Sequence, residues 1–199
     1  WQRSVSGALE EIASGQLEKI VLSRAVRVSS DEEFDVTRLT RHLSAAHPQA
    51  NVFAVRRNGS TFLGASPETL ARVEGRELST AAVAGTARRG DGTSEEIAAA
   101  RGLRADVKEQ HEHQLVVDDV LERVAPFCDR VEAEETPETM SAGPVQHLRT
   151  PISGQLKKGS TFLDVIATLH PTPALGGLPR EEVASALSRH ESSPRGWYG

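Results

Sequence analysis

The stretch NVFAVRRNGSTFLGASPETLARVEGRELSTAAVAGTA, residues 51–87, decides the fold that the sequence predicts. It contains short runs rich in β-branched and aromatic residues, which are typical of strands. Turn-forming pairs separate these runs, at Asn58-Gly59, Ser66-Pro67 and Glu74-Gly75. Consecutive strands joined by such tight turns pair in an antiparallel manner. We therefore predict an antiparallel meander with strands over residues 51–57, 60–66, 69–75 and 76–87.

Helices and further strands lie on both sides of this meander, in blocks rather than in strict alternation. Apolar residues at helical spacing predict helices over residues 4–16, 36–48, 94–124, 160–170 and 180–191. Gly102 is a candidate break in the third of these helices. Further strands are predicted over residues 18–28, 128–135 and 145–156. This order favours an α+β fold, with antiparallel sheets flanked by helices, over a doubly wound parallel fold.

The composition is that of one soluble globular domain. Of the 199 residues, 38% are hydrophobic and 26% are charged. The longest apolar runs, such as residues 20–22, are far shorter than the ~20 residues that cross a bilayer. The net charge of −5 and the scattered basic residues give no general attraction to phosphate backbones. We therefore expect neither a membrane nor a nucleic acid as partner.

The cysteine content and the chain ends carry two further expectations. Cys128 is the single cysteine, so the chain can form neither an internal disulfide nor a cysteine-based zinc site. A reducing, cytoplasmic setting is expected. The chain begins at Trp1 without a methionine and ends with PRGWYG as a new segment begins. We expect a fragment that lacks N-terminal and C-terminal parts.

The run KEQHEHQLVVDD, residues 108–119, is a candidate metal site. On a helix, residues three or four apart share a face, so Glu109, Glu112 and His113 can lie together. His111 and His113 cannot easily bind one ion. Paired carboxylates with at most one imidazole suit Mg²⁺ in preference to zinc. The alternative is a solvated charged helix face, which is the commoner meaning of such a run by itself.

Two other residues carry little weight when taken alone. Lys19 stands in an otherwise apolar predicted strand, where a lysine usually extends its ammonium group to water. Glu68 follows Ser66-Pro67 at a strand end, where an exposed turn carboxylate is the ordinary interpretation. A phosphate loop at residues 154–161 is rejected, because Ser160 stands where its lysine would be required.

Taken together, seven segments resemble the chorismate-binding enzymes, the family of anthranilate synthase component I. They match family blocks in family order: KIVLSRAV, FLGASPETL, VAGTARRG, KEQHEHQLVVDDV, VQHLRTPISGQL, LHPTPALGGLPR and RGWYG. The run VVDDVLERV replaces the Arg-Asn-Asp-Leu-Gly-like run of anthranilate-type members. Ala174-Leu175 stand where the lyase branches typically carry a threonine-containing pair. Within the family, the chain most resembles an isochorismate synthase.

The resemblance implies a Mg²⁺-dependent isomerisation of chorismate to isochorismate, in which water adds at C2 and the C4 hydroxyl leaves. By motif match, Lys19 is the base that activates water and Glu68 is the acid that protonates the departing hydroxyl. Lys19 must then be neutral and Glu68 protonated. We therefore expect burial to lower the pKa of Lys19 and to raise the pKa of Glu68.

The resemblance also implies binding residues. Glu112 is the expected Mg²⁺ ligand, and Glu109 is a ligand through water or an orienting group. Substrate contacts are implied for Gly85, Thr86, Ala174, Leu175 and Tyr198. His147 and His170 lie in matching blocks, with a structural role as an equal alternative. The family's C-terminal section supplies an arginine and further metal-binding glutamates, so we expect residues 1–199 to be a partial catalytic domain, monomeric and inactive by itself.

Two alternatives remain open at this point. A salicylate synthase would carry the same base, acid and metal but would go on to eliminate pyruvate. A non-catalytic remnant would bind a chorismate-like ligand without converting it. An isochorismate synthase would feed menaquinone or catecholate siderophore biosynthesis, and the sequence does not separate these two pathways.

Overall fold

The computed structural model describes residues 1–198, which fall into two compact units. The first unit comprises residues 1–24 and 70–197. The second comprises residues 25–69 together with Tyr198. None of the helices in the described part of the chain is long and apolar enough to span a bilayer.

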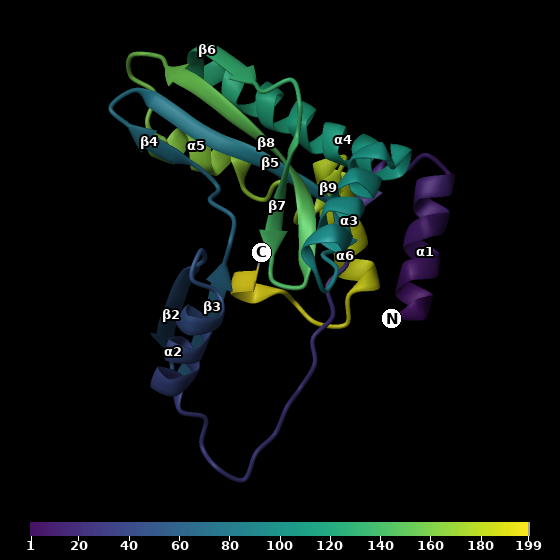
Figure 1. Ribbon diagram of the computed structural model, residues 1–199, viewed down its shortest axis with the longest axis vertical. Helices are drawn as coiled ribbons and strands as arrows, with labels where there is room; N and C mark the ends of the chain where they lie inside the picture. The colour runs from purple at the N-terminus through teal and green to yellow at the C-terminus, as the bar shows by residue number, and fades with distance from the viewer. Residues whose placement is uncertain (199) are drawn as a thin grey trace. The chain divides into compact units, whose positions relative to one another are not determined.

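A five-stranded antiparallel sheet forms the centre of the first unit (Figure 1). Its strands are β4 (Arg72–Glu74), β5 (Glu77–Arg88), β6 (Cys128–Ala133), β7 (Glu138–Ala142) and β8 (Val145–Leu156). The order is β4-β5-β8-β6, and β7 also pairs with β8. β5 and β8 pair along almost their whole length, from Glu77 opposite Gln155 to Arg88 opposite Val145. β5, β6 and β7 therefore all pair with β8.

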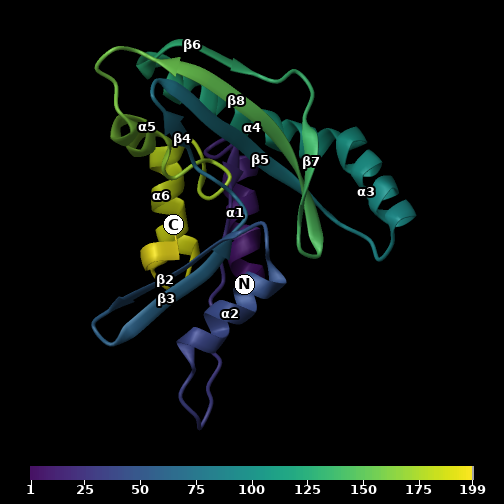
Figure 2. The ribbon, with the colours of Figure 1, turned by 60° about the vertical axis from the view of Figure 1, so that its left-hand side comes forward.

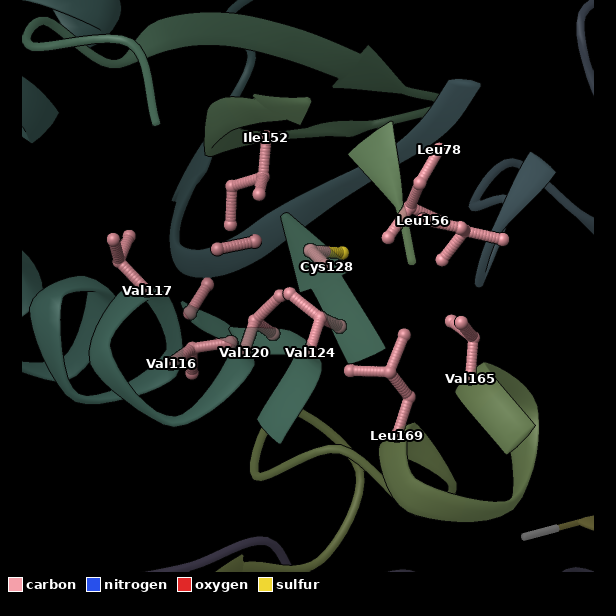
Figure 3. Packing of buried hydrophobic residues seen from close by; sticks show 12 residues of the cluster. Leu78, Val116, Val117, Val120, Val124, Cys128, Ile152, Leu156, Val165 and Leu169 are labelled. Atoms are coloured by element: carbon pink, nitrogen blue, oxygen red, sulfur yellow. The ribbon is translucent and has the colours of Figure 1, made fainter. Parts of the chain in front are cut away.

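The hydrophobic core lies between one face of this sheet and the helix α4 (Val107–Val124). Alternate residues of β8 are buried, as expected of a strand with one covered face. Figure 3 shows valines of α4 together with leucines and an isoleucine of the sheet, and α5 (Phe162–Leu169) adds Val165 and Leu169. Four of these valines have helical spacing: Val116, Val117, Val120 and Val124. The packing of these side chains thus fixes the position of α4 on the sheet.

The predicted helix over residues 94–124 is two helices, α3 (Thr93–Ala105) and α4. The predicted break at Gly102 is wrong, since Gly102 lies inside α3. The break is at Asp106, whose carboxylate accepts a hydrogen bond from the Glu109 N–H at 3.1 Å and caps α4. An aspartate at this position begins a new helix because it satisfies an otherwise unpaired N–H group.

The predicted strand over residues 18–28 is also wrong beyond its first residues. β1 (Lys19–Ile20) pairs with β9 (Gly177–Leu178) in a two-stranded sheet, and no strand follows up to residue 30. α1 (Gln2–Ala13) and α6 (Arg180–His190) pack against each other beside it, around Leu17, Val183 and Ala186. There are also two short 3₁₀ helices, at Ala125–Phe127 and Gly196–Tyr198.

The second unit is a β-hairpin with one helix (Figure 2). β2 (Asn51–Arg57) and β3 (Ser60–Ser66) pair through a turn at Asn58-Gly59, where both residues have positive φ. α2 (Val36–Ala46) contacts both strands. The predicted four-stranded meander is therefore wrong as one sheet, because β2 and β3 pair only with each other, whereas β4 and β5 join the five-stranded sheet. The α+β fold with antiparallel sheets is confirmed.

Candidate active site

Lys19 is buried at the start of β1 and is directed at α4. Its side chain is 6% exposed, and its Nζ atom lies 2.9 Å from Oε1 of Glu112. The opposite strand, β9, pairs with the Lys19 backbone and approaches it closely. A Cβ atom at Gly177 would lie 2.1 Å from the Lys19 carbonyl oxygen. Only a glycine fits so close to another backbone. The contact with Glu112 joins two residues that the sequence had singled out for separate reasons.

Glu109 lies one turn before Glu112 on α4 and faces the strand β5. Its Oε2 accepts the Thr86 N–H at 2.8 Å, and its Oε1 accepts a hydrogen bond from Lys108 at 2.7 Å. Partial burial acts to raise the pKa of Glu109, but the hydrogen bonds from Lys108 and Thr86 outweigh it and hold this pKa below its usual value. The carboxylate is therefore ionised and oriented.

A β-bulge in β5 presents Thr86 to Glu109. The pairing of β5 with β8 shifts between Ala84 and Thr86, and Gly85 has a φ of 75°. A side chain at Gly85 would meet the Glu109 carbonyl oxygen at 3.2 Å. On the other side, Thr86 Oγ1 lies 3.0 Å from Nδ1 of His147. Two predicted substrate-binding residues, Gly85 and Thr86, thus lie beside a predicted metal-site residue.

The histidines of α4 have different surroundings, as their helical phase predicts. His111 is exposed, whereas His113 is 4% exposed and its Nε2 lies 2.7 Å from Thr150 Oγ1. Burial lowers the pKa of His113, which favours a neutral ring. His113 belongs to the packing between α4 and β8. The carboxylates Glu109 and Glu112 remain as oxygen donors at the start of the helix.

The loop before β9 carries the other predicted substrate-binding pair. Ala174 packs against the main hydrophobic core. The Leu175 carbonyl accepts a hydrogen bond from Nη1 of Arg195 at 2.8 Å. His170, at the end of α5, is exposed. This loop continues into Gly176, whose carbonyl accepts the Val21 N–H at 2.8 Å, so it is hydrogen-bonded to the segment that follows Lys19.

Glu68 and Tyr198 belong to the second unit. Burial raises the pKa of Glu68, which is the direction that a general acid requires. Tyr198 is 59% exposed. The roles of Lys19 as base and Glu68 as acid, and the contact of Tyr198 with substrate, stay predictions.

Glu109 and Glu112, one turn apart on α4, are the candidate ligands for a metal ion. Residues 1–198 contain no group of three or more histidine, cysteine, aspartate or glutamate side chains placed to hold one. Mg²⁺ is often bound by one or two carboxylates while it keeps several waters, so Glu109 and Glu112 fit part of such a site. Lys108 lies within 3.7 Å of Glu112 and already neutralises some of this charge.

The comparison with known proteins decides the family. The model of the chorismate binding enzyme family matches residues 1–199. The chain belongs to this family. A salicylate biosynthesis isochorismate synthase of Pseudomonas aeruginosa is 37% identical over 198 residues, an alignment that covers 100% of this chain and 41% of that protein. The chain spans about half the length of the curated relatives it matches.

Solved structures of chorismate-binding enzymes have the same fold. One, named as a 2,3-dihydroxybenzoate-specific isochorismate synthase of Bacillus anthracis, is 32% identical with a TM-score of 0.93, over 98% of this chain and 54% of that one. The menaquinone-specific isochorismate synthase of Escherichia coli is 30% identical with a TM-score of 0.79, over 98% and 45%. The resemblance read from the seven segments is confirmed at the level of family and fold.

Sequence reasoning missed two groups near this site. Lys108, which contacts both glutamates, was a visible signal because it stands four residues before Glu112. Glu191 and Arg195 also stand four residues apart, but they lie at and beyond the end of α6, where helix spacing gives no guidance.

Proposed function

We propose that this chain is part of an isochorismate synthase, which isomerises chorismate to isochorismate. The observation that carries the proposal is the contact of the buried Lys19 with Glu112, which brings the expected base to the expected metal-binding carboxylate. The names of the relatives support the same reaction. Because the chain spans about half of those proteins, the proposed enzyme has further residues that complete the site.

In the proposed reaction, two side chains move protons, one at C2 and the other at C4 of the substrate. Lys19 takes a proton from a water molecule as its oxygen bonds to C2. Glu68 gives a proton to the C4 oxygen, which leaves as water while the ring double bonds shift between the two carbons. The raised pKa of Glu68 supports its role, because an acid must hold its proton at neutral pH.

Glu112 and Glu109 would hold Mg²⁺, which supplies a positive charge that neutralises and orients the ring carboxylate of chorismate. The Thr86 N–H supports this role, since it fixes the Glu109 carboxylate at the start of α4. Gly85, Thr86, Ala174, Leu175 and Tyr198 are the proposed substrate contacts. The proposal is completed by a monomeric, cytoplasmic enzyme that serves menaquinone or siderophore biosynthesis.

Product analysis tests this function on the full-length protein that contains the chain. Purified protein, chorismate and Mg²⁺ are expected to give isochorismate alone, separated by liquid chromatography. Salicylate and pyruvate would instead identify a salicylate synthase. Binding of chorismate without turnover would identify a non-catalytic relative. Residues 1–199 alone are expected to be inactive, and turnover by them would contradict the incomplete site.

A further inference from the structure

A buried ion pair holds the segment that follows Lys19. β1 ends at Ile20, yet the next residues are not free of hydrogen bonds. Nη2 of Arg195 donates to the Val21 carbonyl at 2.5 Å, and the Ser23 N–H donates to Oε1 of Glu191 at 2.6 Å. Side chains from the far end of the chain thus take the place of a paired strand.

The guanidinium group of Arg195 has three kinds of partner. It donates to Glu191 through Nε at 2.9 Å and through Nη2 at 2.6 Å. It also donates to the Val21 carbonyl and to the Leu175 carbonyl. A planar fork of five donors can reach such divergent acceptors at once, which a lysine ammonium cannot do with the same geometry. Arg195 therefore joins the segment after Lys19 to the loop that contains Ala174-Leu175.

The charges of this pair are removed from water. The side chains of Arg195 and Glu191 are 9% and 7% exposed. Hydrogen bonds from Arg195, assisted by the Ser23 N–H, lower the pKa of Glu191 to about 2, so its carboxylate is ionised at neutral pH. Buried ion pairs often contribute little net stability, because desolvation opposes their attraction. Stability alone is therefore a weak reason for this pair.

We propose that Arg195 and Glu191 are positioning residues for Lys19. They act through the backbone of the segment that follows Lys19. Arg195 binds the Val21 carbonyl, two residues after Lys19, and Glu191 binds the Ser23 N–H, four residues after it. With β9 on one side and Glu112 at the amine, these bonds fix the direction of the Lys19 side chain. The inference rests on the proposed function, in which Lys19 is the base.

The test compares Arg195→Ala and Glu191→Gln with wild type, in the full-length protein with chorismate and Mg²⁺. Displacing a catalytic group by about 1 Å costs roughly 10²-fold in rate, so we expect kcat to fall about 10-fold to 100-fold. In Glu191→Gln the KM for chorismate should change less than about twofold, because this substitution leaves the bond of Arg195 to the carbonyl of Leu175, a proposed substrate contact, in place. Glu191→Gln keeps the shape of the side chain and serves if Arg195→Ala does not fold. Arg195→Lys should restore only part of the lost kcat.

Arg180→Ala is the matched control. Arg180 forms a buried pair with Asp119, at 2.6 Å, and donates to carbonyls of α5, but it does not contact the segment after Lys19. We expect Arg180→Ala to lower the melting temperature and leave kcat unchanged. If Arg195→Ala also left kcat unchanged, the inference would be overturned.

A double substitution shows whether Arg195 acts through Lys19. Adding Arg195→Ala to Lys19→Ala should cause no further loss of the residual turnover, because the group being positioned is already absent. A further loss as large as in the wild-type background would overturn the inference. A wild-type protein that forms no isochorismate would overturn the proposed function itself, and the two failures are thereby distinguished.

Discussion

Lys19 is the residue whose removal should matter most to turnover. A positioned general base contributes roughly 10²-fold to 10⁴-fold to a rate. We therefore expect Lys19→Ala to lower kcat by a factor in this range, measured as isochorismate formation from chorismate. Lys158→Ala, in the exposed turn after β8, is the control and should leave kcat unchanged. Full turnover by Lys19→Ala would remove Lys19 as the base.

Gly177 sets how closely β9 approaches β1. Its φ of 142° and the 2.1 Å gap to the Lys19 carbonyl oxygen leave no room for a Cβ atom. We expect Gly177→Ala to lower the free energy of unfolding by about 1–3 kcal/mol, measured by chemical denaturation. Gly102→Ala is the control, because Gly102 lies in α3 with no atom near its missing Cβ, and it should stabilise by about 0.5–1 kcal/mol. Equal stability of Gly177→Ala and wild type would contradict the close approach.

Among the elements, α4 carries both glutamates of the proposed metal site, so its first turn matters for function. Asp106→Ala removes the cap beside Glu109 and should cost about 1 kcal/mol of helix stability. In the full-length protein we also expect weaker Mg²⁺ binding by titration calorimetry. Asp35→Ala removes the equivalent cap of α2, where the carboxylate accepts a hydrogen bond from the backbone N–H of Arg38 at 3.0 Å. Asp35→Ala should destabilise the protein about as much as Asp106→Ala but leave the Mg²⁺ affinity unchanged. Equal Mg²⁺ affinities for the two variants would refute the link between the cap of α4 and metal binding.

Elements with a strong local pattern could be predicted from the sequence, and those that depend on distant partners could not. The valines of α4 share one face in any helix, so the helix and its buried side followed from spacing alone. The β-branched run after Lys19 also has strand character, but only residues 19 and 20 find a partner, in β9. The division between α3 and α4 was misplaced because a glycine is a weaker signal than a capping aspartate.

The candidate site divides in the same way. Helical phase identified Glu109 and Glu112 as neighbours and separated His111 from His113, and the structure agrees. The contact of Lys19 with Glu112 joins positions 93 residues apart in sequence, and no local pattern encodes such a distance. It depends on β9 and on the packing of α4 against the sheet.

At the scale of the whole molecule, the Glu191–Arg195 pair connects the early and late parts of the first unit, and its contribution to stability should depend on pH. The pKa of Glu191 is lowered from 4.5 to about 2, so the contribution is present above about pH 4.5 and is lost as the pH falls toward 2. The difference in free energy of unfolding between wild type and Glu191→Gln should therefore be constant from pH 7 to pH 5 and shrink below that.

Denaturant titrations at a series of pH values measure this difference. Glu122→Gln, on the exposed side of α4, is measured alongside as the control for the loss of one carboxylate. A gap between wild type and Glu191→Gln that stayed constant down to pH 3 would contradict the pH dependence.

The position of β8 in the sheet has a consequence for the order in which the chain folds. β5, β6 and β7 all precede β8 along the chain, and each pairs with it. During synthesis, the β4–β5 hairpin can form early, but the rest of the sheet must wait until residue 156 has left the ribosome. Until then the valines of α4 lack their covering sheet, and β5 presents an unpaired edge to other chains. Aggregation of nascent chains is therefore most probable in the interval before β8 emerges.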